Sequence, residues 1–131
     1  MTTKQSTTHD LTEASFADAI TQNDIVFVDF WAAWCGPCRA FAPTYSKAAA
    51  KHPDIFFGKV DTEAEQSLSA AAAIQSIPTL MAFREKVLVF SQPGALGPAA
   101  LDEVIAAVRA LDMDEVHRTV AEQQKAEAPV S

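Results

Sequence analysis

The sequence lacks a long apolar run, a cluster of basic residues and any cysteine beyond two. No stretch reaches the roughly 20 consecutive apolar residues that a membrane helix needs. The 10 Lys and Arg residues against 17 Asp and Glu give a formal charge of −7. Nucleic-acid affinity depends on clustered Lys and Arg, and no basic stripe is present. The composition therefore argues against a membrane-spanning role and against a nucleic-acid partner.

A secretory signal is not recognised either, because residues 1–10 are polar and Thr-rich with no apolar segment after Lys4. We therefore expect a cytoplasmic protein, in which a close cysteine pair is more often catalytic or metal-binding than structural. The 131 residues are 49% hydrophobic and 21% charged, as in a globular chain with one core. We expect a flexible arm over residues 1–9, one domain over 10–111 and a partly helical or disordered extension over 112–131.

The hydrophobic pattern predicts an α/β fold. Residues 25–31 are apolar on both alternating faces except at Asp29, as in a central strand covered by helices on both sides. The pattern predicts a central mixed sheet flanked by helices on both faces, with strands at 25–31, 55–60, 79–83 and 87–90 and helices at 12–23, 36–51, 62–73 and from 97 onward. The acidic extension is interpreted as a solvated segment that continues the last helix, or alternatively as a docking helix for a partner.

The two cysteines, Cys35 and Cys38, allow three interpretations. A structural zinc site needs four ligands, and the three histidines are too scattered to complete one except through a site shared with a second chain. Two inert core thiols around Gly36-Pro37 would be an unusual core choice. Redox chemistry fits best, because the pair falls at a predicted helix start, where free N–H groups stabilise a thiolate.

The same position suggests separate roles for the two thiols. Cys35 follows the buried strand directly and should expose its sulfur, while Cys38 lies one helical turn further on and should be less exposed. Pro37 lacks an N–H that would have no partner in the first turn and stiffens the loop. We therefore expect Cys35 to attack a target disulfide and Cys38 to resolve the mixed disulfide.

Several motifs together resemble the thioredoxin family over roughly residues 10–110. They are the stretches 34–38 (WCGPC), 28–32 (VDFWA), 59–61 (KVD), 77–79 (IPT) and 94–95 (GA). The resemblance implies the thioredoxin fold and a monomeric protein-disulfide reductase that carries electrons through a redox-active Cys35–Cys38 disulfide and contributes to cell redox homeostasis. It also implies protein disulfides as substrates, re-reduction by an NADPH-dependent flavoprotein, thioredoxin reductase, and no bound cofactor or metal.

Two charged residues are candidates for a catalytic role. Asp29 is the lone acidic residue of the buried strand, and burial would raise its pKa and make it a base for Cys38, the role the family assigns. The alternative is a strand-end carboxylate turned to solvent. Lys59, near the end of the neighbouring strand, either pairs with Asp29 or is an ordinary exposed lysine.

The resemblance also implies a flat target-binding surface. The Ile77–Pro78 bond would be cis and would present the backbone of Ile77 to an extended target peptide. Small residues beside it would leave room for a protein partner. The expected binding residues are Trp31, Trp34, Gly36, Pro37, Ile77, Pro78, Thr79, Gly94 and Ala95.

Two positions depart from the family pattern. Glu85-Lys86 occupies a hairpin turn that usually carries Asn-Gly, so we expect the turn to open or change type. Ser76 replaces a common glycine beside the target surface.

Two alternative functions stay open. One is a thiol oxidase or isomerase of the same fold, which usually carries His before the second cysteine. The other is a thioredoxin-fold binding module with incidental redox activity.

Overall fold

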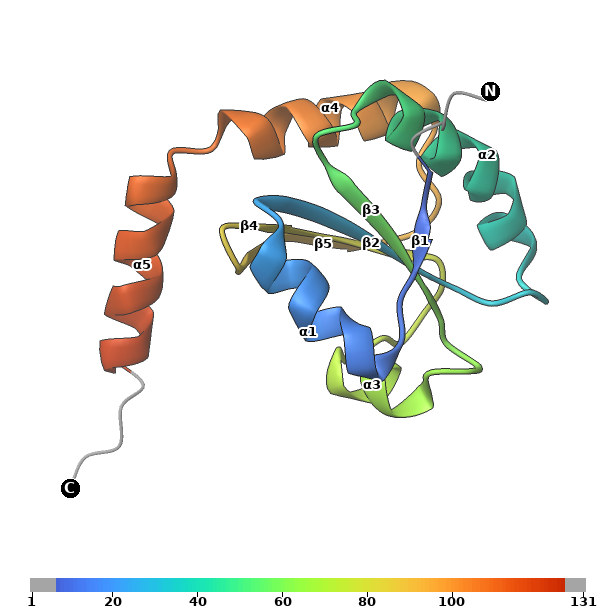
Figure 1. Cartoon of the computed structure of the whole chain (residues 1–131), viewed down its shortest axis with the longest axis horizontal. Helices are drawn as coiled ribbons and strands as arrows, with labels where there is room; N and C mark the ends of the chain where they lie inside the picture. The colour runs from blue at the N-terminus through green and yellow to red at the C-terminus, as the bar shows by residue number, and fades with distance from the viewer. Residues whose placement is uncertain (1–6, 127–131) are drawn as a thin grey trace.

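The computed structural model describes residues 7–126 as a five-stranded mixed sheet with helices on both faces, as the hydrophobic pattern predicted (Figure 1). The predicted arm up to residue 6 and the end of the extension from residue 127 lie outside the described residues. The strands are β1 (His9–Asp10), β2 (Ile25–Trp31), β3 (Phe56–Asp61), β4 (Thr79–Arg84) and β5 (Val87–Pro93). The helices are α1 (Glu13–Gln22), α2 (Gly36–Lys51), α3 (Gln66–Ala71), α4 (Pro98–Ala110) and α5 (Met113–Ala126).

Strand β2 is the centre of the sheet, whose strand order is β1-β3-β2-β4-β5. It pairs in parallel with β3 and antiparallel with β4, while β1 and β5 form the edges. Its first six residues are buried, because both of its faces are covered. Burying one large apolar side chain contributes about 1.5–3 kcal/mol, so this strand anchors the fold.

The two faces of the sheet carry separate cores. On one face, Phe27 of β2 packs with Tyr45 of α2 and Ile105 of α4. On the other face, Val28 and neighbouring apolar residues pack with α1 and α3. Figure 1 shows the same layering, with α2 and α4 on one side of the sheet and α1 and α3 on the other. None of the helices within residues 7–126 combines the length and apolar character needed to cross a bilayer.

Two local predictions were wrong. The arm expected over residues 1–9 overlaps strand β1, in which His9 pairs with β3 and stacks on Phe56 at a centroid distance of 4.6 Å. The helix expected from Thr62 begins only at Gln66. Its N-cap is Glu65, and Thr62 lies before the helix, where its hydroxyl donates to the carbonyl oxygen of Trp31 at 3.0 Å.

The hairpin between β4 and β5 keeps its tight turn, contrary to expectation. Glu85 and Lys86 alone connect the strands, and both adopt positive φ, 49° and 72°. This conformation costs a non-glycine residue about 1–2 kcal/mol, so the turn needs support from outside. The N–H of Glu85 donates to the carbonyl of Asp24 at 2.8 Å, and its carboxylate lies 2.7 Å from Nε2 of His117 in α5. These contacts hold the turn closed.

One interpretation expected the extension to continue α4, but it does not. Leu111 takes an extended conformation after Ala110, and α5 begins as a separate helix at Met113. Figure 1 shows α5 turned sharply away from α4 beside the hairpin. A groove of about 320 Å³ between β5 and α4 and another of about 250 Å³ between β5 and α5 share Val89 and Leu111. The described part of the extension therefore lies against this chain's own hairpin.

Arg84 fixes the end of α4. Its Nη1 donates to the carbonyl oxygens of Val108, Arg109 and Leu111 at 2.9–3.0 Å. A helix leaves its last four carbonyls without intrahelical donors, and a cation also favours that end of the helix dipole. One guanidinium thus stabilises the helix end and the bend that follows it.

We expect Arg84→Met to lower the free energy of unfolding by about 2 kcal/mol, because three carbonyls lose a charged donor. Urea unfolding followed by far-ultraviolet circular dichroism measures the loss. Arg118→Met is the matched control, since within residues 7–126 Arg118 makes only an exposed ion pair with Glu115, and such pairs contribute about 0–1 kcal/mol. Equal losses in the two variants would contradict the assigned role of Arg84.

Candidate active site

The two cysteines lie where β2 gives way to α2, and they are joined by a disulfide. Cys35 is the N-cap of α2, and the backbone N–H of Cys38 donates to its Sγ at 3.2 Å. Pro37 occupies the first turn, where its missing N–H leaves no acceptor unpaired. The sulfur of Cys35 therefore sits at the positive end of a helix dipole, where a thiolate is stabilised.

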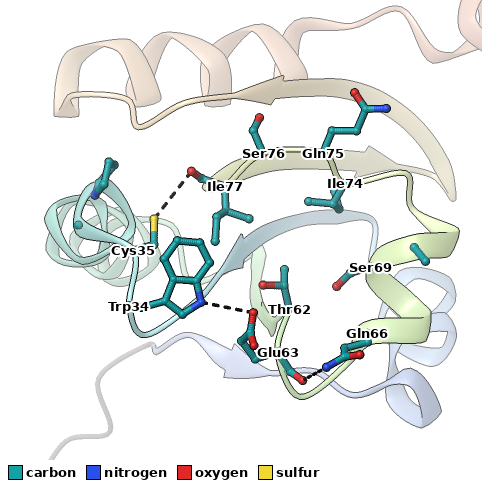
Figure 2. Close-up of a pocket in the computed structure, with 13 residues that line it drawn as sticks. Trp34, Cys35, Thr62, Glu63, Gln66, Ser69, Ile74, Gln75, Ser76 and Ile77 are labelled. Atoms are coloured by element: carbon teal, nitrogen blue, oxygen red, sulfur yellow. Dashed lines mark hydrogen bonds between the residues drawn. The ribbon is translucent and has the colours of Figure 1, made fainter.

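The expected difference in exposure between the cysteines is absent. Cys35 is 4% exposed and Cys38 3%, because both belong to one buried cluster against which Trp31 and Ile77 pack. The asymmetry lies instead in their surroundings. Cys35 lines the adjoining surface cleft and Cys38 does not. Cys35 Sγ also lies 3.8 Å from the carbonyl oxygen of Ile77 (Figure 2).

Asp29 is buried in the middle of the sheet, as one sequence interpretation held, with 1% of its surface exposed. It shares the α2 face of β2 with Phe27, and neither carboxylate oxygen has a hydrogen-bond partner among the described residues. Burial raises its pKa from 3.8 to about 7, and the positive charge of Lys59 opposes part of this rise. The carboxyl group can therefore gain or lose a proton near neutral pH.

Lys59 does not form the ion pair with Asp29 that one interpretation offered. It is the register partner of Asp29 across β2 and β3, yet its Nζ lies over the ring of Trp31, 4.9 Å from the centroid. This distance is within the range of a cation–π contact. Lys59 thus influences Asp29 through its field and contacts Trp31 directly.

The loop before β4 lies beside the disulfide. The Ile77–Pro78 bond is cis, as the resemblance implied. Gly94, at φ 105°, donates its N–H to the carbonyl of Pro78 at 2.7 Å, so the stretch that contains Gly94 and Ala95 adjoins this loop. Thr79 is buried, and its hydroxyl donates to the carbonyl of Ser76 at 2.6 Å. Thr79 therefore shapes the loop from inside and does not line the cleft.

A cleft of about 620 Å³ opens next to Cys35 (Figure 2). Trp34, 67% exposed, forms part of its wall, and its Nε1 donates to a carboxylate oxygen of Glu63 at 3.3 Å. Of the predicted binding residues, the cleft includes Trp34, Gly36, Pro37 and Ile77.

The far wall of the cleft consists of Thr62, Glu63, Gln66, Ser69, Ala70, Ile74, Gln75 and Ser76. Of these residues, only Ser76 was expected beside the target surface. Residues 62–73 were expected to form a helix. One signal could have found Glu63: β2 and β3 are parallel, so the residues after β3 and the cysteines after β2 lie at the same edge of the sheet.

The site defines a class of protein: a small α/β protein whose disulfide at a helix N-terminus exchanges with other thiols and disulfides. Within residues 7–126, no group of three or more His, Cys, Asp or Glu side chains is placed to hold a metal ion.

Comparison with known proteins identifies the family. The thioredoxin family model matches residues 7–107. A Streptomyces coelicolor protein provisionally described as a thioredoxin 2 is 58% identical over 117 residues, covering 89% of this chain and 87% of that protein. A Mycobacterium tuberculosis thioredoxin (strain H37Rv) is 39% identical over 100 residues, covering 75% of this chain and 86% of that protein.

A solved structure of a mutant thioredoxin from Halobacterium salinarum superposes with a TM-score of 0.76 at 28% identity, covering 85% of this chain and 98% of that chain. The chain belongs to the thioredoxin family. With its Cys35–Cys38 pair intact, it is a thiol–disulfide oxidoreductase.

The burial of Asp29 makes stability depend on pH. Between pH 4 and 7 the folded protein holds a proton that the unfolded chain has released, since the pKa is about 7 in the folded state and 3.8 for an exposed carboxyl group. The free energy of unfolding therefore falls as the pH rises through this range and levels off above it.

We expect Asp29→Asn to lose this decline, so that the variant gains roughly 2–3 kcal/mol on the wild type between pH 5 and pH 8. Urea unfolding of both oxidised proteins at several pH values measures the gap, and all other titrating groups cancel in the difference. Parallel stability curves for the two proteins would contradict the raised pKa.

Proposed function

We propose that this chain reduces disulfides in other proteins, with Cys35 as the attacking thiolate and Cys38 as the resolving thiol. The observation that carries the proposal is the position of Cys35: it is the N-cap of α2, lines the cleft and accepts the N–H of Cys38. Cys38 lies one turn further along the helix and outside the cleft. A target sulfur therefore meets Cys35 first.

The reaction is a pair of thiol–disulfide exchanges. The Cys35 thiolate attacks one sulfur of the target disulfide, forms a mixed disulfide with it and releases the other target sulfur as a thiolate. The Cys38 thiolate then attacks Cys35 Sγ, closes the 35–38 disulfide and releases the second target thiolate. Two electrons pass from the protein to the target, and protons from solvent complete the target thiols.

Asp29 serves as the base that takes the proton from Cys38 before the second exchange. It lies on the face of the sheet that α2 covers, and its pKa of about 7 suits proton transfer at neutral pH. Lys59 tunes this carboxyl group through its positive charge, which lowers the pKa.

The target binds across Trp34, Gly36, Pro37 and the Ile77–Pro78 loop. Trp34 offers an exposed apolar ring, and the carbonyl of Ile77 lies beside Cys35. Trp31 packs against the disulfide, and Thr79, Gly94 and Ala95 support the Ile77–Pro78 loop. Extended peptides commonly bind through such backbone edges.

The working cycle needs a source of electrons. In this proposal a thioredoxin reductase, an NADPH-dependent flavoprotein, re-reduces the 35–38 disulfide, and the protein acts as a cytoplasmic monomer. No further cofactor is needed, because the reduced Cys35–Cys38 dithiol itself carries both electrons.

The division of roles predicts different behaviour for the two cysteine variants. Cys38→Ser should accumulate mixed disulfides with protein substrates, because the resolving thiol is missing, whereas Cys35→Ser should trap none. Incubation with oxidised insulin or a cell lysate, followed by non-reducing electrophoresis, measures both. Trapping by Cys35→Ser at the level of Cys38→Ser would refute the assignment.

For the proposed base we expect Asp29→Asn to slow the resolving step about 10-fold or more at pH 7 while leaving the first attack within about twofold. Stopped-flow tryptophan fluorescence with a model disulfide separates the two phases. A slower first attack with unchanged resolution would remove Asp29 as the base for Cys38.

A further inference from the structure

The cleft beside Cys35 carries a single formal charge. Its thirteen lining residues include apolar surface from Trp34, Ile74 and Ile77, several amide and hydroxyl groups, and one ionisable side chain besides the cysteine, that of Glu63. At about 620 Å³ the cleft is large enough for the side chains that flank a target cysteine. A peptide bound to Cys35 would therefore meet one carboxylate and no cation among these lining residues.

Glu63 is held in place from several sides. Its N–H donates to Oδ1 of Asp61 at 2.9 Å, and its carbonyl accepts from the side chain of Gln66 at 3.1 Å. Its Oε2 accepts the indole N–H of Trp34. Figure 2 shows the Trp34 ring between the sulfur of Cys35 and the Glu63 carboxylate. The charge thus has a fixed place along the wall that starts at the reactive sulfur.

The Glu63 carboxylate keeps capacity for a ligand. A carboxylate offers about four acceptor positions, and the Trp34 indole is its only hydrogen-bond donor among the described residues. A Lys or Arg side chain reaching along the cleft could donate to the free positions while its methylene stem covers Trp34 or Ile74. An Asp or Glu at the same place would be repelled.

We propose that Glu63 is a specificity-determining residue, which makes this cleft favour disulfides flanked by Lys or Arg over those flanked by Asp or Glu. The inference rests on the proposed disulfide reductase function and names a substrate class for it. The formal charge of −7 on the whole chain acts in the same direction but over a longer range. The effect of the net charge on substrate preference does not depend on the cleft, whereas the effect of Glu63 does.

The test uses cyclic peptide disulfides that differ at one residue beside a cysteine: Lys, Gln or Glu. The second-order rate constant for their reduction by the fully reduced protein is measured for wild type, Glu63→Gln and Glu122→Gln. Glu63→Gln keeps an acceptor for the Trp34 indole and removes only the charge. Glu122→Gln makes the same change of net charge on the exposed surface of α5, outside the cleft.

Wild type and Glu122→Gln should reduce the Lys peptide about fivefold faster than the Glu peptide at low salt. This is the ratio expected when an exposed attractive charge pair is compared with an exposed repulsive one. In Glu63→Gln this ratio should fall below about twofold, and 0.5 M salt should shrink the wild-type ratio.

An unchanged ratio of the Lys-peptide rate to the Glu-peptide rate in Glu63→Gln would overturn the proposal. An equal loss of rate on all three peptides would also overturn it, because Glu63 would then only support Trp34. Failure of the wild type to reduce any peptide would instead count against the reductase function. The two claims are therefore separable.

Discussion

The contact between the N–H of Cys38 and the sulfur of Cys35 is the interaction on which the site depends. It exists because β2 is buried on both faces and ends at Trp31, so that α2 has to begin within a few residues. The first turn of α2 then directs its free N–H groups toward the sulfur that lies at its cap. Sheet, helix dipole and nucleophile are thus parts of one arrangement.

The buried Asp29 lowers the stability of the fold. This buried carboxyl group has no hydrogen-bond partner within residues 7–126, and it opposes folding at neutral pH because ionising it would leave a buried charge without a hydrogen bond. The large apolar side chains of the same strand, such as Phe27 and Phe30, are fully buried and contribute about 1.5–3 kcal/mol each. Two or three of them offset the carboxyl group, so the central strand can keep an ionisable group next to α2.

The central part of the fold was predictable because its signals are local. The two-sided apolar run of β2 and the Cys35–Cys38 spacing at a helix start identified the centre of the sheet and the redox pair. The rest depends on contacts between distant segments. Strand β1 has two residues and exists only through pairing with β3, and the positive φ of Glu85 depends on Asp24 and His117. The position of Glu63 in the cleft likewise follows from the parallel alignment of β2 and β3.

The most direct test of the account is to identify the reactive thiol chemically. The reduced protein is treated with substoichiometric iodoacetamide at pH 7, and mass spectrometry of the proteolytic peptides locates the label. We expect label on Cys35 in at least about tenfold excess over Cys38, because Cys35 caps α2 and borders the cleft. Equal labelling, or preferential labelling of Cys38, would contradict it.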